Sequence, residues 1–85
     1  MKEQFEEAVK KVDTLTKRPD NQELLRLYAL YKQSVEGDVS GDPPGGFDFK
    51  GLAKYNAWKE LEGKGQEDAM HDYIELVDQL VSKYF

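Results

Sequence analysis

Two lysines interrupt apolar helical faces and are the first candidates for chemistry. Lys32 shares a face with four apolar or aromatic residues: Leu25, Tyr28, Tyr31 and Val35. Lys54 lines up in the same way with Ala57, Trp58 and Leu61. A buried ammonium is costly unless it is paired, although a lysine often packs its stem and keeps its charge in water. Two such lysines beside tyrosines favour an anion site, whose natural ligand would be a phosphate with an aromatic and an apolar portion.

The tyrosines near these lysines also have an ordinary structural interpretation. A tyrosine at the edge of a core often packs its ring and leaves its hydroxyl in water, which would account for Tyr28, Tyr31 and Tyr73. Taken alone, Tyr73 is typical of a core residue rather than a site residue. Trp58 is assigned to the core, and Tyr55 is compatible with either role.

The residue types that nucleophilic catalysis and metal binding need are scarce. The chain has no cysteine and a single histidine, His71, which is interpreted as a solvated surface residue. The carboxylate pairs Glu6–Glu7 and Glu67–Asp68 are typical of solvated faces or helix starts, and nothing places them in a cleft suited to acid–base catalysis. We therefore expect no enzymatic activity, no metal site and no cofactor.

Length and charge narrow the class of protein further. The 85 residues fit a single domain over 1–85, which must be stabilised by helix packing because disulfides are excluded. The net charge of −5 argues against binding to nucleic acid or to anionic membranes. No run of 18 apolar residues occurs, and residues 1–11 lack the apolar stretch of a signal peptide. We expect a cytoplasmic protein without stable membrane anchoring.

Four segments repeat apolar residues at the helical period, and the first two have clear ends. The first carries one apolar stripe, formed by Phe5, Ala8, Val9, Val12 and Leu15. Pro19 stops it, because the residue before a proline avoids the α region. The second starts at Asp20, which forms a capping-box signature with Glu23, and it runs to about Glu36, where Gly37 supplies a cap.

The third and fourth segments complete an all-α pattern. The third runs from about Gly51 to Glu62, and Gly63 closes it. The fourth starts near Gln66, and its apolar residues share one face: Ala69, Met70, Tyr73, Ile74, Val77, Leu80, Val81 and Tyr84. We therefore predict a four-helix bundle.

The second helix is apolar on two sides. One face carries Leu24, Leu25, Tyr28, Tyr31 and Val35, and another carries Leu27 and Leu30. A domain this small cannot easily bury both faces, so we expect one of them to border an exposed groove that takes a partner.

A long connection, residues 38–50, joins the second and third helices. Its Pro43, Pro44, Gly45 and Gly46 exclude regular helix. The connection is long enough to run back along the bundle and make the two helices parallel. We expect Phe47 and Phe49 to pin it to the core.

Three stretches give the chain a family resemblance. Residues 28–38 read YALYKQSVEGD, residues 48–61 read DFKGLAKYNAWKEL, and residues 67–74 read EDAMHDYI. In this order they resemble the acyl-CoA-binding protein family, also called the diazepam-binding inhibitor family, over essentially the whole chain. The resemblance implies a four-helix bundle in up-down-down-up order. It also implies a bowl-shaped groove for one acyl-CoA, whose acyl chain folds back beneath the nucleotide head.

The resemblance also implies roles for single residues around the head group. Tyr28, Tyr31 and Lys32 match the family's phosphate-binding cluster, and Lys54 matches its second phosphate-contacting lysine. Tyr73 matches the aromatic residue that packs near the adenine and ribose.

Further positions complete the implied site or depart from the family pattern. Lys50 matches another contact, and Val9 and Leu25 match walls of the groove, with Leu25 against the acyl chain. Many members carry a lysine where this chain has Asp13, so one phosphate contact is expected to be weakened. Tyr55 replaces a frequent tryptophan.

Two functions of different classes follow. The first is 1:1, high-affinity binding of long-chain acyl-CoA by a monomer that acts as an intracellular carrier and buffer. The second is a helical protein-interaction module whose groove takes an amphipathic peptide. The carrier needs Lys32 and Lys54 at one ligand, whereas a peptide groove would tolerate the loss of either.

Overall fold

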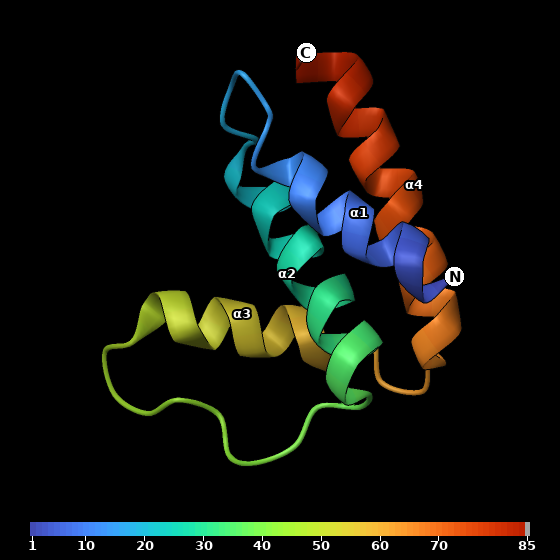
Figure 1. Ribbon diagram of the computed structural model, residues 1–85. Coiled ribbons are helices and arrows are strands. Elements are labelled where there is room, and N and C mark those ends of the chain that lie inside the picture. The colour runs from blue at the N-terminus through green and yellow to red at the C-terminus, as the bar shows by residue number, and fades with distance from the viewer. Residues whose placement is uncertain (85) are drawn as a thin grey trace.

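The computed structural model describes residues 1–84, and within them the chain forms four helices (Figure 1). These are α1 (Lys2–Val12), α2 (Asn21–Glu36), α3 (Phe49–Lys59) and α4 (Gln66–Tyr84). The described residues contain no strand, so the all-α prediction is confirmed. None of their helices is both long enough and apolar enough to cross a bilayer.

Side-chain and glycine caps explain where α2 begins and ends. The Asp20 carboxylate accepts a hydrogen bond from the backbone N–H of Glu23 (2.8 Å), and the Glu23 carboxylate accepts one from that of Asp20 (2.9 Å). This is the predicted capping box. Gly37 follows Glu36 with a positive φ of 82°, which suits a residue without Cβ.

Three helix ends differ from the sequence prediction, and one of them is the end of α3, which lies at Lys59 rather than near Glu62 because residues 60–63 form a turn. α1 ends at Val12, and the turn after it is tightened because the N–H of Leu15 bonds to the carbonyl of Val12. Leu15 nevertheless packs against the core. α3 begins two residues earlier than Gly51, because the Asp48 carboxylate accepts the backbone N–H of Gly51 (2.9 Å) and caps the helix.

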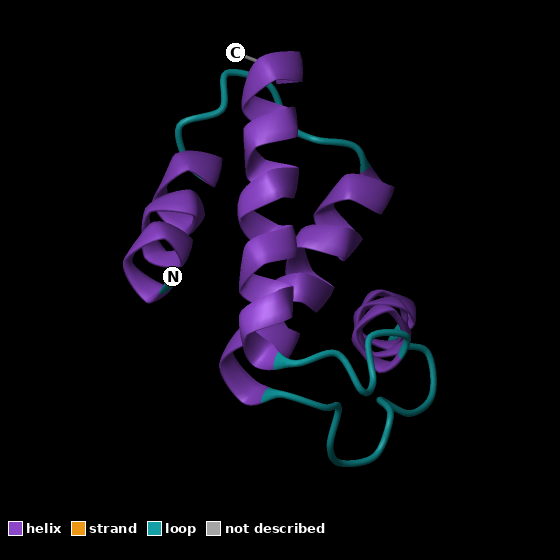
Figure 2. Ribbon diagram, turned by 90° about the vertical axis from the view of Figure 1, so that its right-hand side faces the viewer, coloured by secondary structure: helices purple, strands orange, loops and turns teal. Residues whose placement is uncertain are grey.

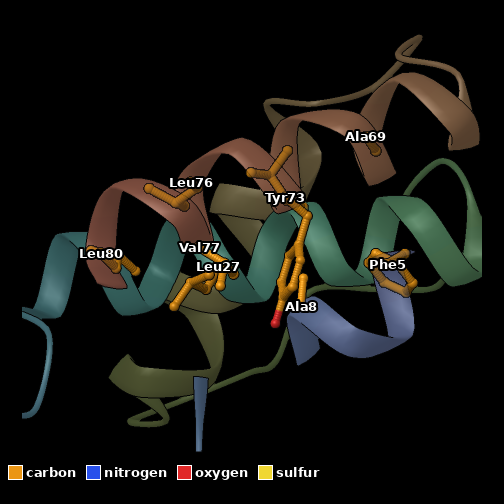
Figure 3. Close-up of a cluster of buried hydrophobic side chains, with 9 residues drawn as sticks. Phe5, Ala8, Leu27, Ala69, Tyr73, Leu76, Val77 and Leu80 are labelled. Carbon is orange, nitrogen blue, oxygen red and sulfur yellow. The ribbon is translucent and has the colours of Figure 1, made fainter. Parts of the chain in front are cut away.

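The core lies between α4 and the two helices that pack against it, α1 and α2. Figure 3 shows the buried side chains meeting between these helices, and the cluster consists of Phe5, Ala8, Leu27, Leu30, Ala69, Tyr73, Leu76, Val77 and Leu80. Leu76 belongs to this core although it was absent from the predicted apolar face of α4. The predicted division of α2 is confirmed in part: Leu27 and Leu30 are buried and Tyr31 and Val35 are exposed, but Leu24 of the second face packs against the core.

α3 packs on α2 alone among the described helices. α1 and α4 run in one direction and α2 in the other, while α3 runs across α2 and is seen nearly end-on in Figure 2. Trp58 fixes the crossing: it is buried, as predicted, and its indole N–H donates to the carbonyl of Gly37 (2.8 Å). Among the described helices, α3 therefore presents a face to α2 only.

The long connection between α2 and α3 is present, but its aromatic residues do not pin it to the core. Phe47 is 91% exposed and Phe49 is 71% exposed, so that expectation was wrong. The two rings instead contact each other edge to face, with centroids 6.4 Å apart. The connection is tied to α3 by the Tyr55 hydroxyl, which donates to the carbonyl of Gly41 (3.0 Å).

Candidate functional site

The two lysines singled out from the sequence lie at the crossing of α2 and α3, each over an aromatic ring of the other helix. Lys32 Nζ of α2 is 4.9 Å from the centroid of the Trp58 ring of α3. Lys54 Nζ of α3 is 5.3 Å from the centroid of the Tyr28 ring of α2. Because Tyr28 and Lys32 are one helical turn apart, the crossing gathers both ammonium groups around one stretch of α2.

The charge of Lys32 is held by neighbours on its own helix. Its ammonium forms an ion pair with the Glu36 carboxylate. The pKa of Lys32 is raised, mainly by this hydrogen bond. Burial is the next largest effect and opposes the rise, while the Glu36 charge and the nearby phenols of Tyr28 and Tyr31 raise the pKa by smaller amounts. Lys32 therefore stays cationic, and the phenols of Tyr28 and Tyr31 belong to its electrostatic surroundings.

An apolar groove lies between α2 and the segment formed by α3 and the turn after it. It has a volume of about 290 Å³, and its apolar lining consists of Leu25, Ala53, Ala57 and Leu61. Polar side chains form the rest of its lining: Gln22, Arg26, Asn56 and Glu60. An extended hydrocarbon chain suits such a groove, because burial of each methylene is favourable by about 0.8 kcal/mol.

A second hollow lies on the other side of α2, against α1 and α4. Its volume is about 560 Å³, and Val9, Tyr31, Val35 and Met70 contribute to its lining. Two cations, Lys2 and Lys10, lie at this hollow as well. Tyr31 is 39% exposed and stacks on Phe5 with ring centroids 5.9 Å apart, so it offers an aromatic surface to a ligand.

Tyr73 lies behind Tyr31 rather than beside the lysines. It is only 4% exposed, and its ring meets those of Phe5 at 5.1 Å and Tyr31 at 6.4 Å. Burial raises the pKa of the Tyr73 phenol to about 12, with smaller contributions from Tyr31 and from the charge of Asp13. Tyr73 thus supports Tyr31 from the core. The Asp13 carboxylate is near enough to Tyr73 for its charge to act at this end of the site.

The remaining predicted residues lie around these features. Leu25 lines the groove between α2 and α3, and Val9 lines the hollow beside α1. Lys50 is exposed in the first turn of α3, four residues before Lys54 and therefore on the same face. The structure gives Lys50 no closer relation to the other site residues than this shared face.

Sequence reasoning did not identify Glu36 as a site residue. Its spacing of four from Lys32 is the signal that could have found it, since side chains at this spacing meet on a helix. An acid at the end of α2 is otherwise typical of an ordinary helix end, and the pattern of cations and aromatic rings does not include it.

One cluster of side chains resembles a metal site. His71, Asp72 and Glu75 of α4 offer ligand atoms that all lie within 4.8 Å of one another. Asp72, however, is already ion-paired with Lys64 at 2.5 Å, and His71 and Glu75 are exposed. The cluster therefore resembles a solvated helix face.

Comparison with known proteins gives one consistent result. The family model described as acyl CoA binding protein matches residues 2–77. The acyl-CoA-binding protein of Saccharomyces cerevisiae is 52% identical over 94% of this chain and 92% of its own length. An Arabidopsis thaliana acyl-CoA-binding domain-containing protein is 53% identical over 95% of this chain and 88% of its own. The crystal structure of an Oryza sativa acyl-CoA-binding protein superimposes with a TM-score of 0.91 at 45% identity, covering 96% of this chain and 91% of that one.

Proposed function

The chain belongs to the acyl CoA binding protein family, and from that premise we propose that it binds long-chain fatty acyl-CoA esters one to one and with high affinity. It releases them chemically unchanged and so acts as a carrier and buffer. One chain supplies the groove, both lysines and the tyrosines, which supports a monomer as the working form. We propose the cytoplasm as its compartment.

The observation that carries this proposal is that Lys32 and Lys54 each lie over an aromatic ring of the other helix where α2 and α3 cross, while α2 also borders an apolar groove and an aromatic hollow. An acyl-CoA has matching parts, since its phosphates separate an acyl chain from an aromatic base. We assign the phosphates to Lys32 and Lys54, with the hydroxyls of Tyr28 and Tyr31 as further donors.

The remaining site residues are assigned from the same layout. The acyl chain lies along Leu25 in the groove between α2 and α3. The nucleotide lies toward Val9 and Tyr31, with Tyr73 supporting it from the core. Lys50 adds a cation at the start of α3 and attracts the head group from a distance.

The magnitudes are compatible with tight binding. Each charge-assisted hydrogen bond contributes about 1.5–3 kcal/mol. Ten buried methylenes contribute roughly 8 kcal/mol at about 0.8 kcal/mol each. Ordering of the ligand offsets part of this sum, and the remainder is compatible with about −12 kcal/mol, which corresponds to nanomolar affinity.

Titration calorimetry with palmitoyl-CoA tests the proposal. We expect one site per chain, and far weaker binding of palmitate or of free CoA, because each lacks half of the interactions. Lys32→Ala should lose at least about 1 kcal/mol, or about fivefold in affinity. Lys59→Ala serves as the control, since it removes an exposed lysine of α3 and changes the net charge of the protein by the same amount.

Two results would contradict the proposal. Absence of binding to any saturated acyl-CoA would exclude the carrier function. Equal binding by the wild type and by Lys32→Ala, together with binding of an amphipathic helical peptide, would favour the protein-interaction module instead.

A further inference from the structure

Glu36 is placed where it can act on the proposed ligand through Lys32. Its carboxylate holds the Lys32 ammonium, while the Trp58 ring lies 4.9 Å from the same nitrogen. The Lys32 side chain is 23% exposed and that of Glu36 is 48% exposed, so a ligand can reach both partners. The nitrogen assigned to the phosphate is therefore paired with an anion that the protein itself supplies.

The stability of α2 does not explain an acid at this position. Glu36 is the last residue of the helix, where the macrodipole favours cations, and the last turn of α2 carries no basic residue. An acid N-terminal to a lysine at this spacing also stabilises a helix better than the order found here, in which Lys32 precedes Glu36. The ion pair therefore contributes little to the stability of α2, and its main effect is on the charge of Lys32.

We propose that the Glu36 carboxylate competes with the ligand phosphate for the Lys32 ammonium, which makes Glu36 a positioning residue that sets head-group affinity and selectivity. The inference rests on the proposed function. A phosphate that reaches Lys32 must displace the carboxylate or share the ammonium with it, and two anions that share one cation repel each other. A phosphate monoester carries about −1.5 to −2 charges near neutral pH, so it displaces Glu36 more readily than a singly charged group does.

Removal of the carboxylate charge tests the competition. Glu36→Gln should tighten palmitoyl-CoA binding by about two- to fivefold, which corresponds to the usual strength of a solvent-accessible ion pair. Glu7→Gln is the matched control, because it changes the net charge equally from an exposed position on α1, outside the ion pairs that residues 1–84 form. Glu36→Gln removes an acid from a helix C-terminus, so we expect it to fold as the wild type does, which thermal unfolding followed by circular dichroism verifies.

A double-mutant cycle separates competition from a structural effect. If Glu36 acts through Lys32, the gain from Glu36→Gln disappears in a Lys32→Ala background. The inference is overturned if wild-type protein binds palmitoyl-CoA but Glu36→Gln does not tighten it. The inference is equally overturned if the gain persists without Lys32, or if Glu7→Gln produces the same gain. Failure of the wild type itself to bind would overturn the proposed function instead, and the inference with it.

Discussion

At the scale of single residues, Lys32 and Lys54 each serve the fold and the proposed site together. Each ammonium lies over a ring of the opposite helix, at 4.9 and 5.3 Å from the ring centroids. Cation–π contacts at such accessible positions contribute about 0.5–1 kcal/mol each. The same contacts restrict where the two ammonium groups can be, so a ligand meets charges that are already placed and loses less entropy on binding.

The charge at position 13 should affect the head-group end of the site. The Asp13 carboxylate is close enough to Tyr73 to contribute to its raised pKa. Asp13→Lys replaces an anion by a cation at this end, and we expect it to tighten palmitoyl-CoA binding by a fewfold and to lower the pKa of Tyr73 from about 12. Calorimetry measures the first effect, and absorbance titration of the phenols measures the second.

The two readouts for position 13 check different statements. An unchanged affinity together with a lowered Tyr73 pKa would show that Asp13 lies beside the core tyrosine but outside the head-group site. An unchanged pKa would contradict the geometry itself.

Candidate site residues could be identified from the sequence where a charged side chain interrupts an apolar helical face. Lys32 and Lys54 stand out because a cation on an apolar face needs a partner. Tyr73 taken alone was interpreted as a core residue, and its burial confirms that interpretation. The Lys32–Glu36 pair was missed because ion pairs at this spacing are common and usually carry little energy.

At the scale of elements, α3 depends on its cap and on α2, because it packs on no other described helix. The Asp48 carboxylate caps the start of α3 by accepting the N–H of Gly51. A Cβ at position 51 would collide with this same carboxylate, so the glycine leaves room for the cap. The orientation of α3, and with it the place of Lys54, rests on these few contacts.

The cap of α3 predicts a non-additive pair of substitutions. Asp48→Ala should lower the free energy of unfolding by about 1 kcal/mol. Gly51→Ala should stabilise by about 0.5–1 kcal/mol in the Asp48→Ala background, since alanine favours a helix over glycine and no carboxylate is in the way. In the wild-type background the same substitution should gain little or lose stability, because it displaces the cap.

Urea unfolding of the four proteins in this cycle measures the coupling. Additive changes would show that the Asp48 carboxylate does not occupy the space beside Gly51.

Element boundaries were predictable where side chains mark them. Both ends of α2 were predicted, the start from the capping box of Asp20 and Glu23 and the end from Gly37. The aromatic residues of the long connection could not be placed in the same way. The rings of Phe47 and Phe49 cover part of each other's apolar surface. A local sequence pattern cannot distinguish this mutual contact from burial in the core.

At the scale of the whole molecule, polar contacts join the ends of the helices around a small core. The Asp38 carboxylate accepts from the N–H of Gly63 at 2.8 Å and from the amide of Gln33 at 2.9 Å. Gln33 is fully buried and also donates to the carbonyl of Lys64. These bonds connect the end of α2 to the turn between α3 and α4, which holds Trp58 and Lys32 in register.

This junction predicts how stability responds to acid. The hydrogen bond from Gly63, followed by that from Gln33, lowers the pKa of Asp38 below its ordinary 3.8. Because the folded state favours the carboxylate, its contribution is present above that pKa and is lost as the pH falls through the lower folded value. Asp38→Asn should therefore lower the melting temperature near neutral pH and make the decline toward acid shallower.

Thermal unfolding across pH tests this contribution of Asp38. Asp42→Asn, in the exposed connection, is the matched control and should follow the wild-type curve. Parallel curves for Asp38→Asn and the wild type would show that Asp38 does not couple protonation to folding.

The periodic apolar pattern and the family resemblance predicted part of the arrangement of the whole molecule. Four helices and the long second connection follow from the apolar repeats, glycines and prolines. The placement of α3 across α2 does not follow from them, because periodicity gives the buried face of a helix but not the direction of its axis.

The most direct test of the central claim is a titration of ¹⁵N-labelled protein with palmitoyl-CoA, followed by the backbone amide resonances. We predict that the changes saturate at one ligand per chain and concentrate on residues 25–36 of α2 and on residues 50–61, which span α3 and the turn after it, with a smaller group around Val9 of α1. Changes centred instead on the exposed face of α4 around His71 and Glu75, or spread evenly without saturation, would contradict a site built on Lys32 and Lys54.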